Sequence, residues 1–460
     1  MASNSESTSE EAPFSGEVEE IMEVVGDPEN SDMEDSEGEG DGERRVFLPG
    51  DSLNEGEMLV RDDSAYHMYH QAQTGAPCLS FDILRDTLGD DRKSYPHTAF
   101  TVAGTQAEKA HLNNLIVMKM SNLNRTRQKA SDDEDSSDSD SDSEDEDEKP
   151  ELETAMLKHL GAINRIRSTT IGQKQVAATW SDTGSVHLWD LSEALSAVGN
   201  AQRMARFMRQ ASHKPLFTFT GHQTEGFAMD WCPTTPGNLI TGDCRKNIHL
   251  WKLQEGGEWH VDQRAYSAHT DSVEDLQWSP TEKNVFASCS VDKSLRIWDV
   301  RAAPSKACMI TMEEAHSSDV NVIHWNRKDP FIVSGGDDGV LNIWDLRHFQ
   351  KKAPPVAKFK HHSGPITSVE WNPRDSTVFA ASGSDDQLTI WDLALERDQE
   401  GPPEGAQDGE GSRFDNIPPQ LLFIHQGQSD IKEVHWHPQI PGMIISTAHS
   451  GFNIFKTISV

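Results

Sequence analysis

The chain has few residues suited to disulfide bonding and no stretch suited to crossing a membrane. Its five cysteines, Cys78, Cys232, Cys244, Cys289 and Cys308, form no CxxC pair. No apolar run approaches the roughly 18 residues that a membrane span needs. The opening residues MASNSESTSEEAP also lack the basic and apolar regions of a secretory signal. We therefore predict reduced core thiols, no secretion and no membrane contact.

Positive charge is absent from two tracts. Residues 1–43 contain 16 Asp or Glu and no Lys or Arg, and residues 131–148 contain 12 and none. These 28 carboxylates supply most of the net charge of −35, so the remaining chain is nearly neutral. Segments this acidic cannot bury enough apolar surface to offset chain entropy. We predict a disordered tail over 1–63 and disordered or acidic loops over 124–150 and 394–420.

Basic stripes are also scarce, since RTRQK (125–129) is the only dense patch, and direct DNA binding is therefore not expected. The serines of the acidic tract each have an acid three residues on, which favours acidophilic kinases. Each phosphate would add about −1.5 to −2 charge. The candidate sites are Ser131, Ser137, Ser139, Ser141 and Ser143.

The middle of the chain contains a repeat. A His is followed nine residues later by a Trp in four units, and a second Trp closes each unit 28 or 29 residues after the His. The four His–Trp–Trp sets are His222, Trp231 and Trp251; His269, Trp278 and Trp298; His316, Trp325 and Trp344; His362, Trp371 and Trp391. Strand-like alternation separated by turns such as GGDDG makes each unit one four-stranded propeller blade.

Weaker units flank the strong ones, and together they predict an all-β, seven-bladed propeller over 97–460. His159 to Leu191 has Ser168 where the first Trp belongs, and Gly427 to Lys456 ends in Phe455. A ring closes by pairing chain ends, which removes exposed sheet edges. We expect FTVAG (100–104) and LIVMKM (115–120) to join the C-terminal FNIFKTI in the seventh blade. Residues 64–96 are predicted to form a short helical segment docked on the propeller.

Ser, His and Asp recur within the repeats. A Ser and an Asp lie four residues apart in three blades, which suggests a hydrolase triad at first sight. An active site occurs once, whereas a structural tie occurs in every blade, so we assign these residues to structure. The predicted network comprises His269, Ser288, Asp292 and Trp298; His316, Ser334, Asp338 and Trp344; and His362, Ser382, Asp386 and Trp391.

One end of the ring is predicted to gather acidic and amide side chains. The residue five before the first Trp of each blade is mostly apolar, so the residues four and six before it are expected to point toward the rim. The predicted face comprises Asn164, Glu225, Phe227, Glu274, Asp319, Asn321 and Asp430. Ala162, Pro365 and Thr367 occupy equivalent positions without an acid or aromatic ring.

The closing tripeptides resemble the signature of the WD-repeat family, and Trp298-Asp299-Val300 is one of them. The segment 66–91, the acidic excursion 394–420 and the following PPQLLFIH resemble the retinoblastoma-associated histone-binding WD proteins, and the acidic tracts resemble their glutamate-rich relatives. In that family an N-terminal helix and an acidic loop form a groove for a histone helix. The resemblance places Asn164, Glu225, Phe227, Glu274 and Asn321 on a histone-tail face. The groove-loop candidates are Asp398, Glu400, Glu404, Asp408, Glu410 and Asp415.

The resemblance implies a chaperone or scaffold that binds core histones and acts in chromatin, including at replication origins. It also implies an escort role for a basic large-subunit ribosomal protein, contact with pre-ribosomal particles, and location in the nucleus, the nucleolus and on chromatin. No Walker loop, glycine fingerprint or metal-ligand cluster is present, so we expect no catalysis, cofactor or metal. The alternative is a substrate receptor for a cullin-type ubiquitin ligase, because WDVR (298–301) and WDLR (344–347) resemble its adaptor-docking motif.

Overall fold

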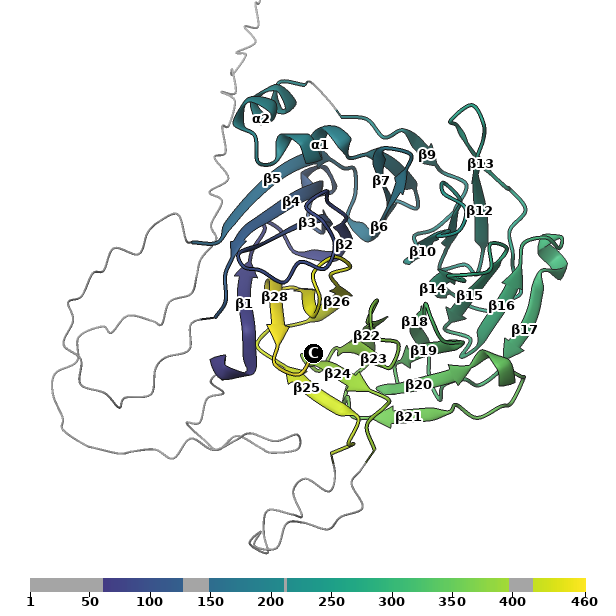
Figure 1. The fold of residues 1–460 in the computed structure, drawn as a ribbon. Coiled ribbons are helices and arrows are strands. Elements are labelled where there is room, and N and C mark those ends of the chain that lie inside the picture. The colour runs from purple at the N-terminus through teal and green to yellow at the C-terminus, as the bar shows by residue number, and fades with distance from the viewer. Residues whose placement is uncertain (1–60, 127–148, 211–212, 397–416) are drawn as a thin grey trace, which may run out of the picture.

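A computed structural model describes residues 61–126, 149–210, 213–396 and 417–460. Seven four-stranded antiparallel sheets stand around a common axis and form a β-propeller, as predicted (Figure 1). The first strand of each sheet contacts its counterparts in the two neighbouring sheets, and these contacts run around the whole ring. The number of blades predicted from the repeats is therefore confirmed.

We number the blades in chain order and give their strands from the axis outward. Blade 1 comprises β2 (Cys78–Leu84), β3 (His97–Thr105), β4 (Asn114–Leu123) and β5 (Glu151–Lys158); blade 2, β6 (Ile163–Ile171), β7 (Lys174–Ser181), β8 (Val186–Asp190) and β9 (Phe217–Phe219); blade 3, β10 (Ala228–Trp231), β11 (Leu239–Gly242), β12 (Ile248–Leu253) and β13 (Trp259–Val261). Blade 4 comprises β14 (Val273–Trp278), β15 (Val285–Ser290), β16 (Leu295–Asp299) and β17 (Cys308–Met312); blade 5, β18 (Val320–Trp325), β19 (Phe331–Gly336), β20 (Val340–Asp345) and β21 (Ala357–Lys360). Blade 6 comprises β22 (Ile366–Trp371), β23 (Val378–Gly383), β24 (Leu388–Asp392) and β25 (Leu421–His425); blade 7, β26 (Ile431–Trp436), β27 (Met443–Ala448), β28 (Gly451–Thr457) and β1 (Tyr66–Ala72).

Blade 7 closes the ring with strand β1, and this corrects one prediction. β1 pairs antiparallel with β28, with Tyr66 opposite Thr457 and Ala72 opposite Phe452. The segments 100–104 and 115–120, expected to close the ring, instead belong to β3 and β4 of blade 1. Blade 1 is thus a complete N-terminal sheet, and the closing strand precedes it in the sequence.

The expectation of a helix within 64–96 is wrong. This segment begins with a single 3₁₀ turn, Asp63–Ala65, and continues as β1 and β2. Burial along β1 alternates at its start, with Tyr66 and Met68 buried and His67 exposed, because one face packs on the blade. Pairing with the edge of β28 satisfies the backbone groups of β1 and favours the strand.

Apolar clusters fill the spaces between neighbouring blades. The closing indoles Trp251, Trp298 and Trp391 are fully buried. Trp298 stacks on Phe286 of its own blade, with ring centroids 5.6 Å apart. Tyr66 of β1 packs with Trp436 and with residues of blade 6, so the closing strand is anchored in a shared core. Removing such an aromatic side chain costs about 3–5 kcal/mol.

A helical hairpin interrupts blade 2 between β8 and β9. It comprises α1 (Ser192–Ala197) and α2 (Ala201–Met208), and α1 contacts β5 and β7 (Figure 1). Asn200 caps α2 by accepting a hydrogen bond from the Arg203 backbone N–H at 3.0 Å. The hairpin therefore lies against the outermost strand of blade 1. Other single 3₁₀ turns are Ala110–Leu112, Pro304–Lys306 and Leu346–His348.

Candidate binding face

The predicted rim residues lie at or just before the beginnings of the innermost strands. Six of these strands, β2, β6, β14, β18, β22 and β26, have a register shift after their first residue. Such a bulge leaves one residue outside the ladder and re-aims its side chain. The skipped residues are Leu79, Asn164, Glu274, Asn321, Thr367 and Lys432. A repeated bulge, rather than plain alternation, therefore sets the rim positions.

The amides of this face hold neighbouring blades together. The Asn164 side chain donates to Glu225 Oε2 at 2.9 Å, which connects blade 2 to the approach of blade 3. Asn321 Nδ2 donates to Asp337 Oδ1 at 2.8 Å and to the Ile366 carbonyl at 3.1 Å. Both amides thus have structural partners, and the carboxylates of Glu225 and Asp337 are fixed at the rim.

The acids of the face differ in their surroundings. Glu274 and Asp319 are partly buried, and burial raises the pKa of Glu274. Asp430 is exposed, but its carboxylate is 2.5 Å from Lys432 Nζ. Phe227 is partly exposed, between Glu225 and blade 3. Glu225, Glu274 and Asp319 therefore provide the anionic part of the face, while Lys432 offsets Asp430.

The departures from the expected pattern are visible in blade 6. The hydroxyl of Thr367 lies 2.9 Å from the Ser382 hydroxyl, so this position presents a satisfied polar group without charge. The groove-loop candidates Asp398, Glu400, Glu404, Asp408, Glu410 and Asp415 lie outside the described residues. The five candidate phosphorylation sites also lie outside them.

Beneath the rim lies a buried charged cluster that the sequence analysis missed. Glu433 on β26 is 1% exposed, and both Arg165 Nη1 and Arg167 Nη2 lie 2.8 Å from its Oε1. Its Oε2 accepts hydrogen bonds from the Ser80 hydroxyl at 2.9 Å and the Phe81 backbone N–H at 2.8 Å. One carboxylate therefore joins the innermost strands of blades 7, 1 and 2.

Further carboxylates accept backbone N–H groups from the next blade around the ring. Asp230 accepts from Trp278 at 2.7 Å, and Asp275 accepts from Ile323 at 3.1 Å. Glu370 accepts from Trp436 at 3.1 Å. These acids lie one or three residues before the first Trp of their blades, as Glu433 does. A polar residue at those two positions was the signal available in the sequence. We call Asp230, Asp275, Glu370 and Glu433 the buried belt.

The belt shifts proton affinities in both directions. Burial raises the pKa of Asp230 to about 7. Burial alone would lower the pKa of His435, but the carboxylates of Glu370 and Glu433 raise it to about 10. Burial would raise the pKa of Glu433, but Arg167 and Arg165 hold it well below its usual range. Each of these groups has a fixed partner, which is typical of structural ionic networks.

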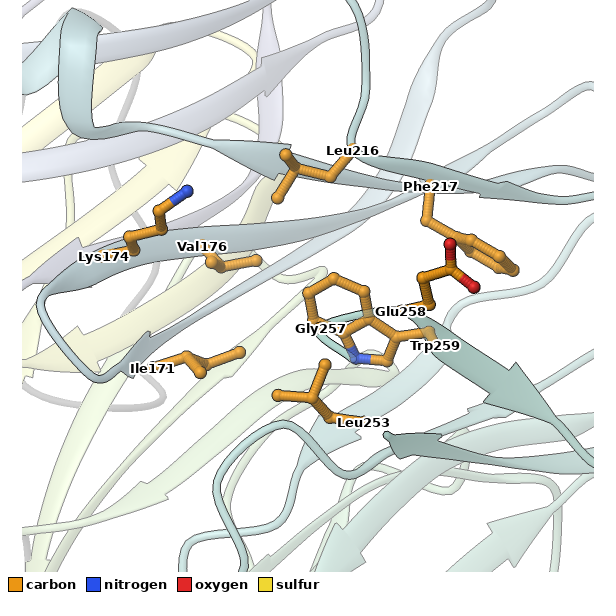
Figure 2. Close-up of a pocket in the computed structure, with 9 residues that line it drawn as sticks. All are labelled: Ile171, Lys174, Val176, Leu216, Phe217, Leu253, Gly257, Glu258 and Trp259. Atoms are coloured by element: carbon orange, nitrogen blue, oxygen red, sulfur yellow. The ribbon is translucent and has the colours of Figure 1, made fainter. Parts of the chain in front are cut away.

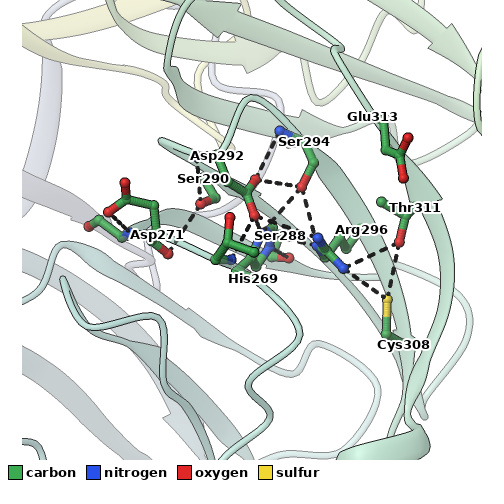
Figure 3. Close-up of polar contacts among 12 residues, drawn as sticks. His269, Asp271, Ser288, Ser290, Asp292, Ser294, Arg296, Cys308, Thr311 and Glu313 are labelled. Carbon is green, nitrogen blue, oxygen red and sulfur yellow. Dashed lines mark hydrogen bonds and ion pairs between the residues drawn. The ribbon is translucent and has the colours of Figure 1, made fainter.

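The repeated Ser-His-Asp sets form hydrogen-bond ties inside the blades. In blade 4, His269 Nδ1 lies 2.8 Å from Asp292, and its Nε2 lies 2.6 Å from Ser288 Oγ, which also accepts from the Trp298 indole at 2.8 Å (Figure 3). The predicted tie of blade 5 has the same contacts: His316 Nδ1 is 3.0 Å from Asp338, its Nε2 is 2.7 Å from Ser334, and Trp344 donates to Ser334 at 2.8 Å.

Blade 6 corrects the predicted tie. His362 Nδ1 lies 2.9 Å from Asp385, and its Nε2 lies 2.9 Å from Thr389 Oγ1, which accepts from the Trp391 indole at 2.8 Å. Asp386 instead accepts the Asp430 backbone N–H at 2.6 Å, and Ser382 contacts Thr367. The tie acid lies six residues before the closing Trp in blades 4, 5 and 6, and in blade 6 that position is Asp385.

The serine position explains the rest of this correction. The hydroxyl residue lies ten residues before the closing Trp in blades 4 and 5, but in blade 6 that residue is Ala381. Thr389 supplies the missing hydroxyl from the next strand. Blade 3 has a tie that was not predicted, with His222 lying 2.9 Å from Asp243 and 2.8 Å from Thr241.

Other sites offer little chemistry. A pocket of about 560 Å³ lies between blades 2 and 3, at the opposite end of β6 from Asn164 (Figure 2). Its wall is mainly apolar, with Phe217 and Trp259 among its residues. In the described ranges, no three His, Cys, Asp or Glu side chains come together as metal ligands. Nor is any described helix long and apolar enough to cross a membrane.

The fold and the closing Trp-Asp motifs define a WD-repeat propeller. The profile described as "WD domain, G-beta repeat" matches residues 261–299, 306–345 and 353–392. A second profile, that of the histone-binding protein RBBP4 of the CAF1 complex, matches residues 56–124, which include β1 to β4.

Full-length relatives narrow the class further. Glutamate-rich WD repeat-containing protein 1 of Dictyostelium discoideum is 45% identical over 431 residues, covering 92% of this chain and 86% of the relative. Ribosome assembly protein rrb1 of Schizosaccharomyces pombe is 41% identical over 449 residues, covering 96% and 90%. Protein HEAT STRESS TOLERANT DWD 1 of Arabidopsis thaliana is 46% identical over 451 residues, covering 90% and 92%. The chain belongs to this family of glutamate-rich WD-repeat proteins.

Proposed function

We propose that this protein is a non-catalytic chaperone and scaffold for strongly basic proteins. Its clients are core histones and a basic large-subunit ribosomal protein, which it escorts toward pre-ribosomal particles. It acts in the nucleus and nucleolus and on chromatin, including with replication-origin proteins. The match to a histone-binding profile over 56–124 supports the histone role, and the name of the fission yeast relative supports ribosome assembly.

The observation that carries the proposal is the anionic rim. Glu225, Glu274 and Asp319 come from three successive blades and lie beside the partly exposed ring of Phe227. Acidic groups around an aromatic surface suit the lysine, arginine and apolar side chains of a histone tail. In the described part of the chain, no basic side chain forms an ion pair with any of the three acids, whereas Lys432 pairs with Asp430.

The acidic tracts act by long-range attraction in this proposal. Carboxylates raise the local concentration of cationic clients, speed their encounter and compete with nucleic-acid phosphates for Lys and Arg. Each exposed ion pair contributes only about 0–1 kcal/mol, so high affinity needs many pairs together with the rim. Binding should therefore weaken steeply with salt, because the Debye length falls from about 10 Å at 0.1 M to about 3 Å at 1 M.

The test measures the affinity of purified core histones and basic ribosomal proteins at increasing salt. The rim variant combines Glu225→Gln, Glu274→Gln and Asp319→Asn, and a second form lacks residues 131–148. A matched control combines Glu255→Gln, Glu258→Gln and Glu282→Gln, which removes three exposed acids elsewhere. We expect the rim variant to bind a histone about tenfold more weakly, since three exposed pairs are lost. Equal affinity of the rim variant and the control would refute the rim assignment.

Phosphorylation of the tract serines is proposed to strengthen cation capture. The two forms compared are the protein treated with an acidophilic kinase and a variant with Ser131, Ser137, Ser139, Ser141 and Ser143 replaced by Ala and treated identically. Tighter histone binding is expected only for the form with intact serines. No gain on phosphorylation would remove the idea.

The alternative role as a ubiquitin-ligase receptor is favoured by one observation. Arg301 and Arg347 lie at equivalent positions of blades 4 and 5, with side chains 71% and 63% exposed. Each pairs with the Asp two residues earlier, at 2.5 Å in Asp299 and 2.7 Å in Asp345. Co-purification with a cullin adaptor, lost in Arg301→Ala and Arg347→Ala, would support this role.

A further inference from the structure

The helical hairpin of blade 2 is firmly attached to blade 1. Ala194 and Ala197 of α1 and Phe207 of α2 are buried in one cluster with Leu157 of β5. The Gly199 backbone N–H, between the two helices, donates to Glu153 Oε1 of β5 at 3.1 Å. The hairpin covers the outer edge of β5, which protects an open sheet edge. This role explains the buried side of the hairpin but not its outer side.

The outer side of α2 concentrates positive charge on a chain with a net charge of −35. Arg203, Arg206 and Arg209 are exposed, and among the described residues none of their guanidinium groups has an ion pair. Residues 200–214 contain no acid, and Lys214 adds a fourth exposed cation. Met208, 71% exposed, lies beside them. We call Arg203, Arg206 and Arg209 the arginine face.

This arrangement is unfavourable for an isolated helix. Arg203 and Arg206, and Arg206 and Arg209, are three residues apart, and like charges at that spacing destabilise a helix by about 0.2–0.5 kcal/mol per pair. An anionic partner would remove this repulsion. The arginine face therefore fits a polyanion better than it fits water.

The chain itself contains such a polyanion close by. Residues 131–148 hold 12 acids and no base. The chain enters β5 at Glu151, and Glu153, two residues on, contacts the connection between α1 and α2. At about 3.3 Å per extended residue, the end of the acidic segment lies within about 20 Å of that contact, and α2 is about 12 Å long. A short covalent connection gives an effective concentration in the millimolar range, which favours this segment over a free polyanion.

We infer that the arginine face of α2 binds the acidic segment 131–148 of the same chain. The bound acids are then held beside blade 1, and a basic client must compete with Arg203, Arg206 and Arg209 to reach them. The arginine face thereby sets how many of the acids are available. The inference concerns a contact within the free protein, so it stands or falls independently of which client binds.

A photocrosslinking experiment tests the contact directly in the full-length chain without client. A photoreactive phenylalanine derivative replaces Ala205, an exposed residue of α2, and in a control protein it replaces Val356, which is 57% exposed in blade 5. Nuclease-treated protein is irradiated, and crosslinked peptides are identified by mass spectrometry. We expect residues 131–148 to crosslink to position 205 and not to position 356. The yield should fall about tenfold in 0.5 M salt, because exposed ion pairs are screened.

Two charge variants of the protein labelled at position 205 sharpen the result. Arg203→Gln, Arg206→Gln and Arg209→Gln together should reduce the crosslink to the same extent as salt. The matched control, Lys352→Gln, Lys358→Gln and Lys360→Gln, removes three exposed cations from blade 5 and should leave the yield unchanged. Equal yields from the two variants would overturn the inference. Crosslinks from position 205 only to nucleic acid, only to another segment of the chain, or to nothing would also overturn it.

Discussion

Glu274 and Asp275 are adjacent in the sequence but belong to different regions of the molecule. Glu274 is the bulged residue of β14 and faces the rim, whereas Asp275 lies in the buried belt and accepts the Ile323 backbone N–H of the next blade. A one-residue bulge thus separates an acid available to a partner from an acid used by the fold. The comparison teaches that acidity alone does not define a binding site in this ring, because position relative to the bulge decides the role.

The strongest way to test this comparison is to neutralise one acid in each region by the same chemical change. Glu433→Gln should lower the free energy of unfolding by about 3–5 kcal/mol, because Arg165 and Arg167 lose the carboxylate that compensates their buried charge. Urea denaturation measures the loss. Glu274→Gln is the matched rim control and should change stability by less than about 0.5 kcal/mol. Similar losses in both variants would contradict the division into rim and belt.

The two neighbouring aspartates of blade 6 offer a second contrast. Asp385→Ala should cost about 1–3 kcal/mol, since it leaves His362 and the Ser363 backbone N–H without their acceptor. Asp386→Gly should cost far less, because Asp386 has a φ of 61° and glycine adopts that conformation without strain. Thermal and urea unfolding compare the pair. A larger loss at Asp386 would restore the tie expected from the sequence.

The pH dependence of stability separates belt acids from each other. The folded-state pKa of Asp230 is raised to about 7, above its unfolded value near 3.9. Its contribution is therefore fully present below about pH 4 and is lost as the pH rises toward 7. Relative to Asp230→Asn, which stays neutral, the wild-type protein should lose on the order of 1 kcal/mol of unfolding free energy between pH 5 and pH 8. A constant difference between the two proteins across this range would contradict the raised pKa.

The smallest expected effect is at Asp430. Its carboxylate pairs with Lys432 in an exposed position, so Asp430→Asn should change stability by less than about 0.5 kcal/mol. The same substitution frees Lys432 and should weaken histone binding slightly, by about twofold. Isothermal titration at low salt measures both the affinity and its salt dependence. A tenfold loss would move Asp430 into the group of Glu225, Glu274 and Asp319.

The sequence predicted what is local and repeated, and it missed what depends on distant pairing. His269, Ser288 and Trp298 recur at fixed spacing, so the blades and the tie followed from one unit. The nature of β1 did not follow, because its seven residues become a strand only by pairing with β28, more than 370 positions later. Counting from Ser382 misplaced the blade 6 acid, whereas counting back from Trp391 identifies Asp385. The bulge and the belt needed the register of each strand, which alternation alone does not provide.

The pairing of β1 with β28 also sets a timetable for synthesis. Between Ala72, the last residue of β1, and Gly451, the first of β28, lie 378 residues. At about 5–20 residues per second, the ribosome needs about 20–75 s to deliver the partner strand. During that interval the nascent chain carries an unsatisfied edge, and a premature stop before residue 451 leaves the circle permanently open. Quality control of this protein therefore depends on the seven residues of β28 as much as on its repeats.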